Sequence, residues 1–220
     1  MHDLRMVHGD LKGVCFTSSK LNISTLTSTK ANILVNKDRR ACIADFGLST
    51  ITGIVTRATA GASQASLTSK DSLMSFTGGG TRRWMSPELL DPERFGMPES
   101  EGNRPTRQSD CYALGMVIYE VGARTSKFIV VVSRLTVVIT QVLCGHHPYL
   151  KFPSDILAVH AITEGVRPAK PKGAKQLGFN NELWRTVELC WLEDRNARPD
   201  VGVIHSCLND AAAFWYMREF

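Results

Sequence analysis

The sequence has 220 residues, 43% of them hydrophobic and 21% charged, which is typical of one globular domain, alone or with an appendage. Its net charge of +5 would suit a nucleotide or a nucleic acid, but the basic residues are scattered; we therefore expect an ordinary solvated surface and no nucleic-acid partner. Six cysteines without a CxxC pair argue against a disulfide framework or a zinc site and favour a reducing, cytoplasmic location.

The first 50 residues predict a loop followed by two short strands. Apolar runs at 31–35 and 41–44 flank the polar residues 36–39, which is the pattern of a β-hairpin. The following segment, 49–80, is rich in Ser, Thr, Gly and Ala and has little periodicity. It is predicted to be a long mobile segment.

The remainder of the chain predicts helices. Residues 107–121 are apolar on nearly every side, as in a buried helix, and Ser109 is its expected N-cap. Cap and stop signals predict three further helices, at 154–164, 180–192 and 201–220. The predicted fold class is α+β, mainly α-helical, with one small β-hairpin.

One stretch, 128–143, is apolar enough to be considered as a membrane span. It is about 16 residues long and contains Ser133, Arg134, Thr136 and Thr140, whereas a span needs roughly 20 apolar residues. The N-terminus lacks the apolar region of a signal peptide. We expect no membrane partner.

Three short motifs indicate chemistry: His8-Gly9-Asp10-Leu11-Lys12, Asn32-Ile33-Leu34-Val35 and Asp45-Phe46-Gly47. Their order and residue types resemble the active site of eukaryotic-type protein kinases. The resemblance implies that Asp10 is the base that orients the attacking hydroxyl and that Lys12 spreads the charge of the transferred phosphoryl group. Asn32 and Asp45 would be ligands of Mg²⁺, a hard cation that prefers oxygen. Leu34 would touch ATP.

Further matches extend the resemblance from His8 to about residue 208. Ser86-Pro87-Glu88 resembles the end of a kinase activation segment, which would run over 45–88, and Thr81 resembles the threonine beside the base of Ser/Thr kinases. Asp110 resembles the helix residue that holds the catalytic loop, and Arg198 resembles the partner of Glu88 in a structural ion pair. His8 and Phe46 are expected in the core, and Gly47 completes the Asp-Phe-Gly motif.

The acceptor class follows from the same comparison. Trp84-Met85 and Cys190-Trp191 resemble the tyrosine-kinase-like branch, whereas Lys12 favours serine and threonine acceptors. His-Gly-Asp also opens the catalytic loop of small-molecule kinases, but those lack the Ser-Pro-Glu element and the long segment before it. Gly9 replaces the arginine that usually pairs with a phosphorylated activation segment, so we expect activity to be independent of such phosphorylation.

The chain departs from the family pattern in three places. Only seven residues precede His8, so we expect a C-terminal lobe without the N-terminal β lobe that clamps ATP. The family spacing between base and Mg²⁺ ligand is restored when residues 14–30 are removed. Removal of residues 121–141 likewise restores the spacing from Asp110 to Gly145 and Pro148.

Both insertions have the borders of an intron. Each begins with Val, whose codons start GT, and ends with Lys or Gln, whose codons can end AG. At 17 and 21 codons they suit the short introns of fungi, so the chain resembles a fungal kinase-like protein with two retained introns. The alternative is two genuine loop insertions, which sequencing of the transcript distinguishes.

Two functions remain open at this level. The resemblance implies an ATP- and Mg²⁺-dependent Ser/Thr kinase that acts on a protein substrate. As this isolated piece it is expected to be inactive, because the lobe that clamps ATP is absent and the first insertion would displace Asn32 from Asp10. The alternative is a catalytically dead kinase-like binding module or a gene-model fragment.

Overall fold

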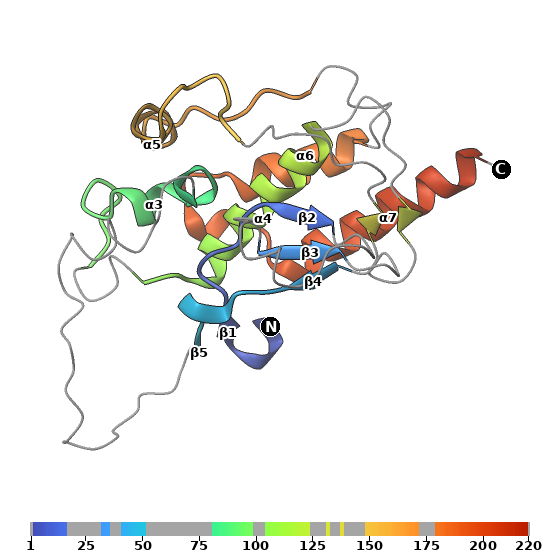
Figure 1. Cartoon of the computed structure of the whole chain (residues 1–220), viewed down its shortest axis with the longest axis horizontal. Helices are drawn as coiled ribbons and strands as arrows, with labels where there is room; N and C mark the ends of the chain where they lie inside the picture. The colour runs from blue at the N-terminus through green and yellow to red at the C-terminus, as the bar shows by residue number, and fades with distance from the viewer. Residues whose placement is uncertain are drawn as a thin grey trace.

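A computed structural model describes residues 2–16, 32–35, 41–51, 81–98, 104–123, 131–132, 137–138, 148–171 and 179–219 (Figure 1). Within these ranges helices hold more residues than strands, and the strands form three small sheets. This agrees with the α+β, mainly helical class predicted from the sequence. Most of the predicted mobile segment, residues 52–80, lies outside the described ranges.

The predicted hairpin is present. Strands β3 (Ile33–Val35) and β4 (Ala41–Ile43) pair antiparallel, with Ile33 opposite Ile43. A second antiparallel pair joins β1 (Met6–Val7), which follows the 3-10 turn η1 (His2–Leu4), to β5 (Thr50–Ile51). The strands of these two pairs lie next to the three motifs in the sequence: the first motif follows β1, the second includes β3, and the third lies between β4 and β5.

The first insertion contributes a strand that the sequence did not predict. Strand β2 (Val14–Phe16) pairs parallel with β3, with Val14 opposite Ile33. Two parallel neighbours need a long crossover between them, which residues 17–32 are numerous enough to provide. The expectation of a plain loop over 14–30 is therefore wrong for its first three residues, and 17–30 lie outside the described ranges.

The four predicted helices are present with shifted ends. Helix α5 begins after the Ser154 cap, whose side chain accepts a hydrogen bond from Leu157 N, and Gly165 follows it with φ +78°. Helix α6 is capped in the same way by Asn180. Their bounds are α4 (Arg107–Ala123), α5 (Asp155–Thr163), α6 (Asn181–Cys190) and α7 (Val201–Glu219).

The predicted cap of α4 is wrong. Thr106, not Ser109, caps this helix: Thr106 Oγ1 accepts a hydrogen bond from Ser109 N at 3.1 Å. Ser109 returns the contact, since its Oγ accepts from Thr106 N at 2.8 Å. This reciprocal pair is a capping box, in which Ser109 occupies the third helical position.

Helices α4 and α6 pack against each other closely enough to require glycine. A Cβ atom on Gly115 would lie 2.7 Å from Cys190 Cβ and 2.9 Å from Trp191 Nε1. Around this contact α4 is buried on most sides, which explains its nearly uniform apolar sequence. In Figure 1, α4 and α6 lie at the centre and α7 runs beside them towards the C-terminus.

One aromatic ring in this core lies against two guanidinium groups. Tyr112 on α4 is fully buried, and Arg198 and Arg167 lie 5.1 Å and 5.5 Å from its ring centroid. Burial raises the pKa of the Tyr112 phenol well above its usual value. The two cations therefore meet a neutral ring, and each adds a favourable cation–π contact.

The second insertion is described in part. Helix α4 extends into it as far as Ala123, and strands β6 (Val131–Val132) and β7 (Val137–Val138) pair antiparallel. The other residues of 121–141 lie outside the described ranges. No helix in the described parts is long and apolar enough to cross a membrane.

Candidate active site

The first motif is held in place by one carboxylate from α4. Buried Asp110 accepts hydrogen bonds from His8 N at 2.7 Å and Gly9 N at 2.9 Å. His2 Nε2 lies 3.1 Å from the same carboxylate. Asp110 thus fixes the backbone immediately before Asp10, as its resemblance to the family's helix anchor implied.

Only one tautomer of the His8 ring makes both of the hydrogen bonds described for it. Its Nδ1 lies 3.2 Å from Asp10 N and must accept that hydrogen bond, so Nε2 carries the proton donated to Ala44 O at 3.0 Å. The neutral imidazole therefore links the first motif to the third. His8 is 1% exposed, in agreement with the predicted core position.

Phe46 does not share that burial. Its ring lies 5.4 Å from the His8 ring between centroids, yet 48% of the residue is exposed. The expectation that both lie in the core is therefore wrong for Phe46. The physical reason is that its contact with the His8 ring leaves about half of the residue exposed in the described parts of the chain.

Asp10, Lys12 and Asn32 form one hydrogen-bonded cluster. Asp10 Oδ2 accepts from Lys12 Nζ at 2.6 Å and from Asn32 Nδ2 at 2.8 Å. Asn32 Nδ2 also donates to the carbonyl oxygen of Asp10 at 2.7 Å. All three side chains are largely buried, so water screens these interactions weakly. The Lys12–Asp10 ion pair and the hydrogen bond from the Asn32 amide therefore strengthen each other.

The segment 14–30, predicted to be an insertion, does not separate Asp10 from Asn32. Asn32 N donates to Lys12 O at 2.9 Å, so the chain leaves and returns at neighbouring points. The expected displacement of Asn32 is therefore not seen. Closing a long loop costs little more than closing a short one, which is why the insertion is compatible with this contact.

Asp45 lies next to the cluster but is not hydrogen-bonded to it. The preceding residue, Ala44, donates its N–H to Asn32 O at 2.8 Å. Asp45 has φ +61°, in the left-handed region that aspartate tolerates better than most residues, and its carboxylate accepts from Gly47 N at 3.4 Å. The carboxylate is exposed.

Two oxygen ligands for a divalent cation are available in this arrangement. The hydrogen bonds of Asn32 to Asp10 use only its amide nitrogen, so its carbonyl oxygen is not part of them. The exposed Asp45 carboxylate is the other candidate. Two protein oxygens suit Mg²⁺, which usually keeps several waters and binds substrate phosphates.

The predicted ion pair between Glu88 and Arg198 is present. Arg198 Nη1 and Nη2 donate to the two carboxylate oxygens at 2.6 Å and 2.8 Å, and both side chains are buried. Thr81 begins the turn η3 (Thr81–Trp84), and Leu34 lies in β3 opposite Cys42. The side chains of Thr81 and Leu34 are outside the described parts.

Gly9 occupies a position that no side chain fits well. Its φ is +80°, and a Cβ atom there would lie 2.9 Å from Pro105 Cγ and 3.1 Å from Leu48 O. The backbone turns in the left-handed region, which favours glycine. The absence of an arginine at this position is thus tied to the shape of the loop itself.

Sequence reasoning missed several residues that shape this site. His2 contacts Asp110, Pro105 lies against Gly9, and Arg83 anchors the turn η3. Pro105 and His2 belong to loop and turn segments without a periodic pattern. Arg83 is 4% exposed, although arginine is usually a surface residue, so nothing in its neighbours signalled its burial.

Comparison with known proteins places the chain among phosphotransferases. Residues 28–208 match a family model described as protein tyrosine and serine/threonine kinase. The matched range includes Asn32, Asp45 and the Glu88–Arg198 pair, and the first motif precedes it.

Individual relatives agree with the family model. The chain is 28% identical to sheep activin receptor type-2A over 201 residues, covering 91% of the chain and 34% of the receptor. It is 22% identical over 215 residues to the Arabidopsis thaliana serine/threonine-protein kinase STY46, covering 96% of the chain and 25% of that protein. A probable serine/threonine-protein kinase of Dictyostelium discoideum is 26% identical over 179 residues, 81% of the chain and 14% of that protein. The chain thus spans about a third or less of the length of these curated relatives.

Proposed function

The chain belongs to the protein tyrosine and serine/threonine kinase family, and on that premise we propose that the Asp10–Lys12–Asn32 cluster is a site of phosphoryl transfer from ATP to serine or threonine hydroxyls of proteins. The observation that carries the proposal is the shared Asp10 carboxylate oxygen, which accepts hydrogen bonds from both Lys12 and Asn32. The contact unites three motif residues across an insertion of 17 residues.

Each residue has a definite task in this proposal. Asp10 accepts a hydrogen bond from the substrate hydroxyl and orients its oxygen towards the phosphorus atom. Lys12 holds positive charge beside the transferred group, where the charge of its oxygens must be stabilised. Asp110 and His8 hold the Asp10 backbone in place through the hydrogen bonds described above.

The nucleotide and its cation would lie on the Asn32 and Asp45 side of the cluster. Asn32 Oδ1 and the Asp45 carboxylate would hold Mg²⁺, which neutralises phosphate charge when bound. Leu34, within the Asn32 motif and in the middle of β3, would form the floor of the nucleotide site. Thr81 and the rest of 45–88 would form the activation segment that receives the protein substrate.

The proposal also assigns the lobe and the two insertions. These 220 residues correspond to the C-terminal lobe of the kinase fold, because their motifs run from the catalytic loop to the Arg198 partner of Glu88. Residues 14–30 and 121–141 are insertions into that lobe. The 2.9 Å bond from Asn32 N to Lys12 O supports the first assignment, since removal of 14–30 would turn this bond into the closing bond of a four-residue β-turn.

A phosphorylation assay tests the proposal in two forms of the protein. The chain alone and the chain fused behind the N-terminal lobe of a tyrosine-kinase-like enzyme are incubated with labelled ATP, Mg²⁺ and a general Ser/Thr protein substrate. We expect transfer by the fusion only, and its loss in Asp45→Asn and Asp10→Asn variants. Removal of Mg²⁺ with EDTA should have the same effect.

The other outcomes separate the parts of the proposal. Transfer by the chain alone, abolished by Asp45→Asn, would contradict the lobe assignment and leave the kinase assignment intact. A folded fusion without any transfer would contradict the kinase chemistry and favour a binding module without catalysis.

A further inference from the structure

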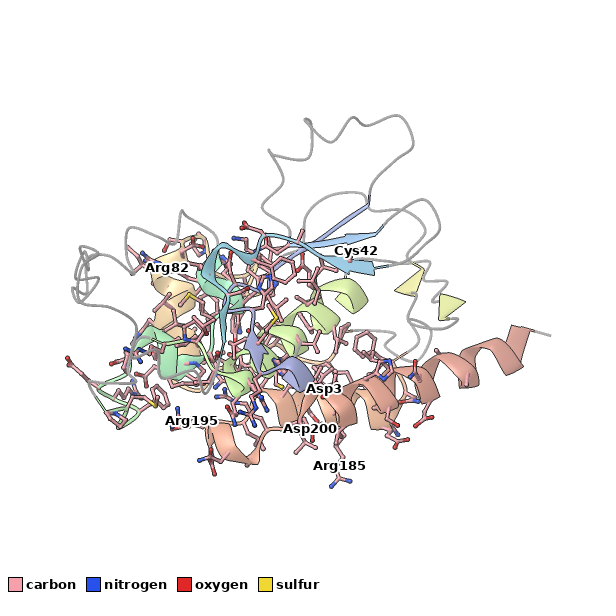
Figure 2. All side chains as sticks on the ribbon, turned by 90° about the horizontal axis from the view of Figure 1, so that it is seen from below. Asp3, Cys42, Arg82, Arg185, Arg195 and Asp200 are labelled. Carbon is pink, nitrogen blue, oxygen red and sulfur yellow. The ribbon has the colours of Figure 1, made fainter. Side chains whose placement is uncertain are left out.

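The turn η3 is attached to the α5 side of the molecule through one buried arginine. Arg83 Nε donates to Asp155 Oδ1 at 2.7 Å, Nη1 to Tyr149 O at 2.7 Å and Nη2 to Phe152 O at 3.0 Å. Every acceptor belongs to the turn before α5 or to its first residue. Figure 2 labels the neighbouring Arg82 beside α5, which shows how near the two elements lie.

The acceptor geometry requires a guanidinium group. Three of the acceptors, Pro148 O, Tyr149 O and Phe152 O, are backbone carbonyls and one is the Asp155 carboxylate, and together they use the Nε, Nη1 and Nη2 donors. Arginine presents five N–H donors in one plane, whereas lysine offers three donors at one point. Tyr149 has φ +60°, so the same group also binds the carbonyl of a residue in an unfavourable backbone conformation.

The next residue attaches the same turn to α4. Trp84 Nε1 donates to Glu120 Oε2 at 2.9 Å, and both residues are buried. Consecutive side chains of η3 therefore bind two different helices: Arg83 binds the start of α5, and Trp84 binds α4. After Met85 the chain continues into Ser86, Pro87 and Glu88, so Glu88 of the Glu88–Arg198 pair lies four residues beyond the end of η3.

We propose that Arg83 is a positioning residue that locks the η3 turn to α5 and so presets the surface that receives the Ser/Thr-containing peptide. The proposal rests on the proposed kinase function, in which Thr81 at the start of η3 lies beside the base. Arg83 makes no contact with substrate in this proposal. It acts through the turn that it holds.

Hydrogen exchange measured by mass spectrometry tests the lock without requiring catalysis. In Arg83→Met, amides of 81–86 and 148–156 should exchange about tenfold faster, because both segments lose their common partner. Segment 181–190 on α6 should be unchanged. Arg83→Lys should restore part of the protection, since it keeps a cation beside Asp155.

Arg94→Met is the matched control. Arg94 pairs with Glu164 at the other end of α5, and both side chains are 46% exposed. An exposed pair contributes little, so this variant should exchange like the original chain. Should Arg83→Met not fold, Asp155→Asn removes one partner only and is expected to accelerate exchange in the same two segments by a smaller factor.

Two results would overturn the proposal. Faster exchange in every segment alike, 181–190 included, would mean that Arg83 supports the core in general. Unchanged exchange at 81–86 would mean that η3 is held by other contacts. In the active fusion, Arg83→Met should raise KM for the peptide more than it lowers kcat, and an equal loss in both would count against the proposal.

The two proposals can fail separately. If the fusion transfers no phosphate, the exchange pattern still decides whether Arg83 locks η3. If exchange is unaffected while transfer persists, the kinase assignment survives and the role of Arg83 does not.

Discussion

At the scale of single residues, Gly9 shows how a local backbone conformation limits the chemistry available nearby. The backbone turns at Gly9 with φ +80°, directly after the two N–H groups that donate to Asp110, and Pro105 lies where a Cβ atom would project. A larger residue would have to strain the backbone and displace the proline ring. The loop is therefore built around glycine rather than merely lacking an arginine.

The first prediction concerns this position. Gly9→Arg should destabilise the chain by about 1–2 kcal/mol from left-handed strain and by a further 1–3 kcal/mol, roughly, from the contact with Pro105. Gly96→Arg is the matched control, because Gly96 has φ +63° but a Cβ atom there would meet nothing within 4 Å. Urea unfolding of both variants measures the difference, and equal losses would contradict the steric part.

Residue-level prediction from sequence worked where a residue's partner was fixed by a motif. Asp110, Glu88 and Arg198 lie where the resemblance implied, because each serves a buried backbone or charge that few residue types can satisfy. Phe46 could not be predicted in the same way. Its exposure depends on what packs above the ring, which the motif does not encode.

At the scale of elements, helix starts depend on side chains that bond the first free N–H groups. Both Thr106 and Ser109 are suitable residue types, and the apolar pattern of α4 does not distinguish them. The structure resolves the choice because Asp110 N donates to Thr106 O at 3.0 Å, the first bond of the helix. Similarly, no periodic pattern could show that Val14–Phe16 would pair with a strand beginning at Ile33.

The second prediction tests the cap. Thr106→Ala should reduce the free energy of unfolding by about 1 kcal/mol, since Ser109 N would lose its acceptor. Thr106→Ser keeps the oxygen and should remain within a few tenths of the original value, a difference that thermal or urea unfolding resolves. Equal losses in the two variants would show that the threonine methyl group, not the hydroxyl, is what α4 requires.

At the scale of the whole molecule, stability comes from a helical core in which α4 is surrounded by its neighbours. Burial in this core raises the pKa of two thiols from 9.0: that of Cys111, on α4, to about 11 and that of Cys190, on α6, to about 12. Because the pKa is higher in the folded state, these thiols lose their protons at a lower pH in the unfolded chain than in the folded chain. The associated stability is complete below pH 9 and is lost as pH rises towards the folded-state values.

The third prediction concerns how the free energy of unfolding depends on pH. The free energy of unfolding should fall above pH 9, by up to about 1.4 kcal/mol per pH unit for each thiol. Cys190→Ala removes one ionising group but keeps the Cβ atom that meets Gly115, so its stability should fall less steeply between pH 9 and 11. Urea unfolding in reducing buffer gives both slopes, and parallel slopes would contradict the assignment to Cys190.

The fourth prediction concerns the first insertion. Deletion of 14–30 should give a folded chain that is more stable by roughly 1–2 kcal/mol, because a long loop is replaced by a short turn. Deletion of 17–30 alone should be worse, since β2 would remain without the crossover that a parallel pair requires. Circular dichroism and urea unfolding compare the two, and a better-folded 17–30 deletion would show that β2 is an integral strand.

The contact between Lys12 O and Asn32 N also makes this a place where the chain could be opened. A break made within 14–30 would leave Asp10 on one fragment and Asn32 on the other, and Lys12 and Asn32 would still be neighbours across it. Under the proposed function, the two fragments would form one active centre only when they associate, as in a split reporter. The position of the insertion therefore offers a route to make activity depend on the meeting of two separately expressed halves.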